Sequence, residues 1–217
     1  TLACVMERED PRDAWVSGRY ASLDDLPQGA TVGTSSLRRM ALLRALRPDL
    51  KIEALRGNLD TRLKKLDDGL YDGIVLAAAG LKRLGLASRI RTVFEPEQML
   101  PAAGQGALGI EVRSDRTDVA QVLQALLHSP TWLAVSAERA VSRVMGGSCS
   151  MPLAAFATWQ GEVLSIRAVW GDPEGVLPLV SAQAQEAVID AQAATLLGER
   201  VARQLQNGVA LQTGQRE

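Results

Sequence analysis

Two patterns of apolar and polar positions divide this chain of 217 residues. In the first, an apolar run, a loop and a helical pattern follow one another three times. The runs predict strands over 30–32, 51–55 and 73–79, and the helices that follow them cover 37–46, 59 to about 69, and a short stretch from 80. Repeated β-loop-α units predict a mainly parallel sheet with helices on its faces.

The second pattern begins near residue 153 and lacks this repeat. Three strands are predicted over 153–159, 162–170 and 176–183, and a helix over 186–207. A three-stranded antiparallel sheet with a helix on one face makes a small α+β domain. The fold class is therefore α/β, with a parallel-sheet domain followed by a small C-terminal α+β domain.

Shorter elements surround and join these two regions. Strands are predicted at 1–6 and 108–112, and Trp15 and Val16 form a short apolar segment. A helix is predicted from about Thr117, with Val119, Val122, Leu123 and Leu126 on one apolar face. The next helix starts at Ser129-Pro130 as N-cap and first helical residue, so His128 is interpreted as the C-terminal residue of the helix before it.

The run Gly33-Thr34-Ser35-Ser36-Leu37-Arg38-Arg39 holds the most distinctive chemistry. Ser36 is the natural N-cap, which places Arg38 and Arg39 in the first turn of the helix. The helix dipole is already positive there, so two cations conflict with it unless an anion is bound. A solvated arginine pair on an ordinary strand-to-helix turn is the alternative.

Further arginines follow the same edge of the predicted sheet. Ligands of such sheets bind outside the carboxyl ends of the strands, where Arg56, Arg62 and Arg83 also fall. Guanidinium groups bind carboxylate or phosphate with paired hydrogen bonds, so we expect a small ligand with several carboxylates. A merely solvated rim of arginines is the competing interpretation.

Composition narrows the partners. The 24 basic and 25 acidic residues give a net charge of −1, which offers no reason to expect a polyanion. Aromatic residues make up 4% of the chain, and its apolar runs are too short to cross a bilayer. We expect neither nucleic acid nor a membrane as partner, no metal site, and no leader for export.

The two cysteines differ in context. Cys4 lies in an apolar strand pattern and is predicted to be buried. Cys149 follows Gly146-Gly147-Ser148 in a small-residue loop outside any apolar period, where a thiol is accessible for covalent attachment. An unreactive loop thiol remains the alternative. A separate glycine-rich segment, Gly104-Gln105-Gly106-Ala107, crosses from the first region toward the next strand. Its glycines allow either a close approach of the backbone to a ligand or a hinge.

Several motifs occur together in a fixed order: Gly33 to Arg39, Leu55-Arg56-Gly57-Asn58 with Thr61-Arg62-Leu63, Ala79 to Arg83, Gly104 to Ala107, and Gly146 to Cys149. The ordered set closely resembles the porphobilinogen deaminase family, the hydroxymethylbilane synthases, over essentially the whole chain. The resemblance implies a cytoplasmic, monomeric transferase of porphyrin and haem (tetrapyrrole) biosynthesis. It condenses four porphobilinogen molecules into hydroxymethylbilane and releases ammonia.

The family's fold and cofactor map onto this numbering. The resemblance implies a remnant of a first domain in 1–8, a second domain of periplasmic-binding-protein type in 9–104, a return segment of the first domain in 105–127, and a C-terminal domain in 128–217. A dipyrromethane cofactor is implied as a thioether on Cys149. Arg38, Arg39, Arg56, Arg62 and Arg83 then bind acetate and propionate groups, and the same cleft is lined by Thr34, Ser35, Ser36, Gly57, Ala77, Gln105 and Gly106.

One family motif is missing. Family members carry a Ser-x-Lys-Asp motif whose aspartate assists the loss of ammonia, and this sequence contains no Lys-Asp pair. No residue therefore inherits that role, and the arginines cannot replace it, because a developing cation needs a carboxylate beside it. We therefore expect a truncated form with weak or no activity alone. The alternative is a non-catalytic dicarboxylate-binding module of solute-binding-protein type, and a nucleotide enzyme is disfavoured because no Gly-x-x-x-x-Gly-Lys-Ser/Thr run exists.

Overall fold

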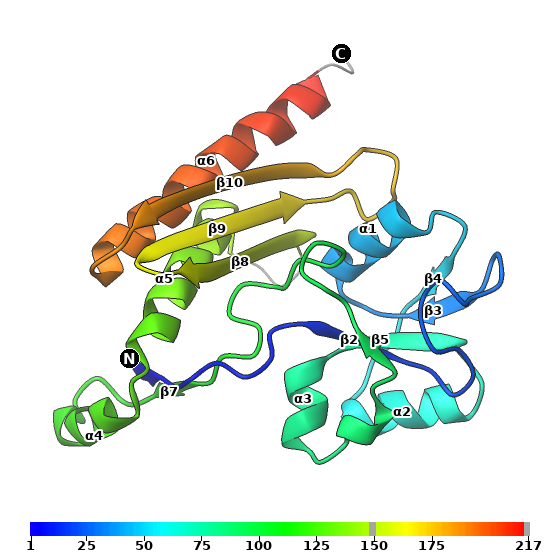
Figure 1. Ribbon diagram of the computed structural model, residues 1–217, viewed down its shortest axis with the longest axis horizontal. Helices are drawn as coiled ribbons and strands as arrows, with labels where there is room; N and C mark the ends of the chain where they lie inside the picture. The colour runs from blue at the N-terminus through cyan, green and yellow to red at the C-terminus, as the bar shows by residue number, and fades with distance from the viewer. Residues whose placement is uncertain (148–150, 215–217) are drawn as a thin grey trace.

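Three β-sheets and the helices around them make up the part of the chain that the structure describes. The computed structural model describes residues 1–147 and 151–214 (Figure 1). The largest sheet has the strand order β4-β3-β5-β2-β6, and its strands are β2 (Asp13–Val16), β3 (Thr31–Gly33), β4 (Lys51–Glu53), β5 (Gly73–Ala77) and β6 (Thr92–Val93). The predicted α/β class is confirmed.

One strand of this sheet runs against the others. β3 is parallel to β4 and β5, as the three predicted β-loop-α units require. β2 is antiparallel to both of its neighbours, β5 and β6, so the sheet is mixed rather than purely parallel. The antiparallel direction brings the first residue of β2, Asp13, to the edge where β3 and β5 end. Asp13 pairs there with Ala77, the last residue of β5.

Helices cover both faces of the large sheet. α1 (Leu37–Leu46) packs on one face through Leu42 and Leu43, which join a core cluster with Trp15. α2 (Leu59–Asp67) and α3 (Ala78–Arg83) cover the other face. The expected N-caps are confirmed, because the side chains of Ser36 and Asn58 accept backbone N–H groups of α1 and α2.

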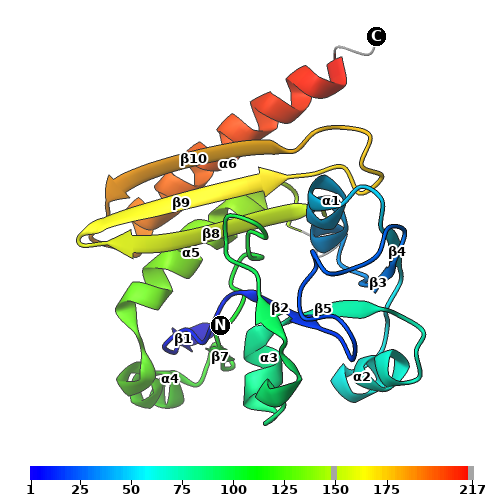
Figure 2. The same cartoon turned by 45° about the vertical axis from the view of Figure 1, so that its right-hand side comes forward.

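The second sheet is antiparallel, as predicted. Its order is β10-β9-β8, and its strands are β8 (Leu153–Gln160), β9 (Val163–Trp170) and β10 (Val180–Ala187). α5 (Ser129–Val144) and α6 (Ala191–Gly214) pack on the same face of it, which Figure 2 shows from a second side. The small β1 (Leu2–Val5) and β7 (Gly109–Glu111) form a separate antiparallel pair near α4 (Thr117–Leu123).

Two predicted elements near the C-terminus were displaced. The third strand was expected over 176–183 but begins at Val180, because the Asp172 carboxylate accepts the backbone N–H groups of Glu174, Val176 and Leu177 and holds them in a turn. The last helix was expected from 186 but begins at Ala191. The Asp190 side chain caps it by accepting the N–H of Ala193.

Other predictions were wrong at the scale of single residues. His128 is the N-cap residue of α5 rather than a C-terminal helix residue, and its Nδ1 lies 2.8 Å from Thr131 Oγ1. The expected apolar face of α4 is not buried, since Val122 is 74% exposed. α3 starts at Ala78 instead of Gly80 because alanine extends a helix readily. Short 3₁₀ turns occupy Ala87–Arg89 and Gln124–Leu126.

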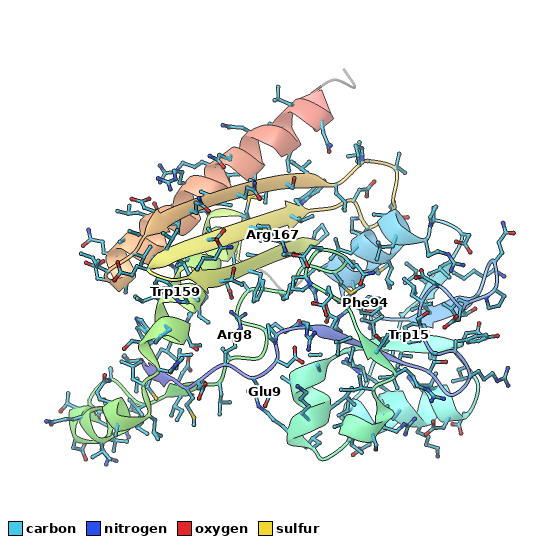
Figure 3. All side chains as sticks on the ribbon, in the orientation of Figure 1. Arg8, Glu9, Trp15, Phe94, Trp159 and Arg167 are labelled. Atoms are coloured by element: carbon cyan, nitrogen blue, oxygen red, sulfur yellow. The ribbon has the colours of Figure 1, made fainter. Side chains whose placement is uncertain are left out.

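A buried ion pair joins the parts of the molecule. Arg8 lies on the segment from β1 to β2, where Figure 3 labels it beside Glu9. Its guanidinium binds both carboxylate oxygens of Glu138 on α5, at 2.6 and 3.0 Å, and its Nε donates to the Gln105 carbonyl. Glu138 also accepts the N–H groups of Gly104 and Ala157. This one carboxylate therefore ties the 104–106 crossing to α5 and β8.

None of the helices in the described ranges combines the length and the apolar character needed to pass through a membrane.

Candidate functional site

The site is organised around Asp13, which is 0% exposed. β2 runs antiparallel and delivers this carboxylate to the sheet edge from which α1 starts. Arg38 and Arg39 stand in the first turn of α1, so both guanidinium groups reach Asp13. The anion that the two first-turn cations require is therefore supplied partly by the chain itself.

Arg38 is held on several partners. Its Nη1 donates to Asp13 Oδ2 at 2.6 Å and to the Leu100 carbonyl at 2.8 Å. Its Nη2 donates to Asp13 Oδ1 at 3.2 Å and to Gln105 Oε1 at 3.1 Å. These four bonds use every hydrogen of the two terminal nitrogens. Only Nε remains, and it is buried with no hydrogen-bond partner among the described residues.

Arg39 shares the same carboxylate. Its Nε and Nη2 both donate to Asp13 Oδ1, at 2.9 and 2.7 Å, and its Nη1 donates to the Val75 carbonyl. Burial alone would raise the pKa of Asp13, but the charges of Arg39 and Arg38 outweigh burial and hold that pKa below its ordinary value. Asp13 is thus a fixed anion at neutral pH and does not serve as a proton donor.

A cavity of about 360 Å³ opens beside this cluster. Ser36, Arg38, Arg39 and Gln105 line it from the large sheet and the crossing segment, and Ser142 and Met151 line it from the C-terminal region. Arg38 is 4% exposed and Arg39 is 9% exposed, so little of either guanidinium faces open solvent. The cavity joins a positive, largely desolvated wall to a wall of small and apolar side chains.

The structure brings some predicted site residues together and leaves others apart. Ser36, Arg38, Arg39 and Gln105 line the cavity. Arg62 Nε donates to the Gly57 carbonyl at 2.8 Å, and Arg83 Nη2 donates to the Gly106 carbonyl at 2.7 Å. Arg56 is exposed. These three arginines do not line the cavity, and their role in binding a ligand stays a prediction.

The remaining predicted residues support the backbone around the site. Thr34 Oγ1 accepts the N–H of Ser36, and Ser35 Oγ donates to the Leu55 carbonyl. Gly106 has φ +85°, and a side chain there would meet the Glu9 carbonyl. Cys149, the expected attachment point of the cofactor, lies outside the described residues, although Gly147 and Met151 on either side of it line the cavity.

Sequence reasoning missed Asp13 and Glu138. Asp13 closes a polar stretch and directly precedes the apolar Ala14–Val16, so a carboxylate at a strand start opposite two first-turn arginines was the available signal. Glu138 stands between buried residues of α5, next to Ala137 and one turn before Val141. A lone charge on the apolar face of a helix indicates a buried ionic partner.

Fold and site together define a mixed α/β protein with a cavity, lined by two arginines, between its two larger sheets. Two family models match the chain. "Porphobilinogen deaminase, dipyromethane cofactor binding domain" matches residues 1–121, and "Porphobilinogen deaminase, C-terminal domain" matches residues 132–207. The chain belongs to the porphobilinogen deaminase family.

Curated relatives agree with this assignment. The chain is 71% identical over 213 residues to a porphobilinogen deaminase of Albidiferax ferrireducens, covering 98% of this chain and 68% of the relative. It is 60% identical to the porphobilinogen deaminase of Ralstonia nicotianae, covering 96% and 63%. It is 57% identical to the porphobilinogen deaminase of Paraburkholderia phytofirmans, and the match covers 97% of this chain and 61% of that relative. The chain thus spans about two thirds or less of the length of these relatives.

Solved structures are less similar. A putative methionine-binding lipoprotein of Bacillus subtilis aligns with a TM-score of 0.42 and 16% identity, over 59% of this chain and 61% of that one. A likeness at this level decides nothing about a ligand.

Proposed function

We propose that this chain forms the cofactor-holding part of a porphobilinogen deaminase, which condenses porphobilinogen into hydroxymethylbilane and releases one ammonia for each carbon–carbon bond formed. The observation that carries the proposal is the buried, unpartnered Nε of Arg38 beside the 360 Å³ cavity. A buried donor without a partner is costly, and a carboxylate oxygen of a ligand satisfies it.

The residues present fit the dipyrromethane cofactor that the family model names. Arg38 Nε and the outer edge of Arg39 hold its carboxylate side chains, Ser36 and Gln105 add polar contacts, and Cys149 carries the thioether. When bound, the cofactor supplies a pyrrole carbon to which the first substrate is joined. The chain's own contribution is to orient carboxylates, to exclude water with its small and apolar wall, and to balance charge without moving a proton.

We further propose that the four domain segments implied by the family, 1–8, 9–104, 105–127 and 128–217, describe this chain. The 217 residues contain no Lys-Asp pair and so no counterpart of the family's catalytic aspartate. This chain alone therefore binds pyrrole carboxylates but releases ammonia slowly or not at all. Arg56, Arg62 and Arg83 serve carboxylates that extend beyond the cavity.

Intact-mass measurement tests the attachment. After prolonged incubation with porphobilinogen, we expect the wild-type chain to gain a covalent pyrrole mass slowly, with one ammonia lost for each unit attached, and the Cys149→Ser variant to stay at the bare-chain mass. Cys4→Ala is the matched control and should gain the same mass, because Cys4 is 0% exposed in β1. A folded wild-type chain that binds porphobilinogen but never gains mass would favour the dicarboxylate-binding module instead.

A further inference from the structure

Asp13 gives the site a defined net charge. The guanidinium groups of Arg38 and Arg39 are both within hydrogen-bond distance of the Asp13 carboxylate, so the cluster has two positive charges and one negative charge. Arginine stays protonated in proteins, and the buried Asp13 is ionised beside it. Arg38 and Arg39 are the only charged side chains among the described residues that line the cavity. Counting Arg38, Arg39 and their shared counter-ion Asp13, the cavity wall therefore carries a net charge of +1.

Asp13 also fixes which donors a ligand meets. The paired terminal nitrogens of Arg38, which would suit a forked contact, are turned to Asp13, Leu100 and Gln105. The N–H groups of this pair that have no partner among the described residues are the buried Nε of Arg38 and one hydrogen on each terminal nitrogen of Arg39. A planar carboxylate needs few donors, whereas a doubly charged tetrahedral anion needs more donors and more positive charge than this wall offers.

From this geometry we propose that Asp13 determines the charge selectivity of the cavity: it restricts the site to singly charged groups such as a carboxylate and disfavours dianions. The inference rests on the proposed function, in which the ligand's acidic groups are carboxylates. A monoanion neutralises the cluster completely. A dianion leaves one uncompensated negative charge in a partly buried cavity and faces the Asp13 carboxylate through the same arginines.

Matched probes separate charge from shape. Methanesulfonate and sulfate both present sulfonyl-type oxygens, but the first carries one charge and the second two, and acetate is the carboxylate probe. Each is titrated at millimolar concentration against chloride at constant ionic strength, and the shift of the thermal midpoint gives an apparent affinity. We expect the wild-type chain to bind acetate and methanesulfonate in preference to sulfate.

Two substitutions change the net charge of the cavity wall in opposite directions. Asp13→Asn raises the net charge of the wall to two, and we expect sulfate affinity to rise at least about tenfold relative to methanesulfonate, an inversion of the wild-type order. Ser36→Asp lowers the net charge to zero, and the response to both monoanions should be lost. Asp remains a good N-cap, so this variant keeps α1. Ser36→Asn has nearly the same shape as Ser36→Asp without the charge, so it is the steric reference, and we expect it to bind both monoanions more tightly than Ser36→Asp.

Each of these measurements has a result that would overturn the proposal. A folded Asp13→Asn variant with the wild-type preference, or a Ser36→Asp variant that still binds monoanions, overturns the proposal, as does a wild-type chain that binds none of the probes. If Asp13→Asn does not fold, the Ser36 pair decides. The covalent mass at Cys149 is an independent readout, so the selectivity can fail while the proposed function stands, and the reverse also holds.

Discussion

At the scale of residues, the sequence indicated a need for an anion but not where the anion comes from. Two arginines in the first turn of α1 conflict with the helix dipole, and that conflict was visible in the sequence. Its partial solution, Asp13, lies 25 residues from Arg38 in a four-residue strand that is too short to show a period. The change from polar to apolar residues at Asp13 marks the start of a strand, but nothing local shows which cations its carboxylate will pair with.

Asp13 should be one of the most sensitive positions for stability. Asp13→Asn leaves two buried guanidinium groups short of a counter-ion, so we expect a loss of about 3–5 kcal/mol in the free energy of unfolding near neutral pH. Urea unfolding followed by circular dichroism measures it. Asp115→Asn, which breaks only an exposed pair with Arg113, is the control and should cost no more than about 0.5 kcal/mol.

The difference in stability between the wild-type chain and Asp13→Asn should depend on pH. The pKa of Asp13 is lower in the folded chain than its unfolded value of about 3.9, so its contribution is complete above that value and is lost as the pH falls toward the folded pKa. The gap in stability between wild type and Asp13→Asn should therefore narrow on acidification below about pH 4. A gap that widens there would contradict this assignment of charge.

At the scale of elements, prediction succeeded where a cap or a period was present. The helices that start after Ser36 and Asn58 were located by their caps, and β5 by its continuous apolar run. The third strand of the antiparallel sheet was misplaced because its apolar start, 176–179, is held in a turn by a side chain several positions earlier. A hydrophobic pattern alone does not distinguish such a turn from a strand.

The contact between β5 and β2 gives a test at this scale. A side chain at Gly73 would overlap the indole ring of the buried Trp15, so Gly73→Ala should destabilise the protein by about 1–3 kcal/mol or more. Gly80→Ala in α3 is the matched control, because no other heavy atom lies within 4 Å and alanine favours a helix by up to about 1 kcal/mol. Equal stability of the two variants would contradict the packing of β2 on β5.

At the scale of the whole molecule, the sequence predicted two sheets but not the ionic junction between them. Arg8 stacks 5.0 Å from the centre of the Phe156 ring while it binds Glu138, which is 0% exposed. Neither residue stands in a motif, and they are 130 positions apart in the chain. Only the folded arrangement places them together, next to the crossing segment that presents Gln105 to Arg38.

Removing one partner of the Arg8–Glu138 pair should lower the free energy of unfolding more than replacing both partners with apolar residues. We expect Glu138→Leu alone to lose about 3–5 kcal/mol, because the largely buried Arg8 is left without its carboxylate, whereas the double variant Arg8→Met with Glu138→Leu should recover much of that loss. Guanidinium chloride unfolding of both single variants and the double variant gives the coupling energy. Strict additivity of the two single losses would show that the two side chains do not act as a pair.

The antiparallel strand β2 has a consequence for folding fidelity. Asp13 and Trp15 face the side of the sheet covered by α1, while Ala14 and Val16 face the cluster under α2 and α3. A slip of β2 by one residue would turn the carboxylate into that apolar cluster, far from any guanidinium, and would leave both arginines of α1 without their counter-ion. The buried charge of Asp13 thus penalises a one-residue slip in strand pairing, and it acts as an electrostatic check on assembly of the sheet.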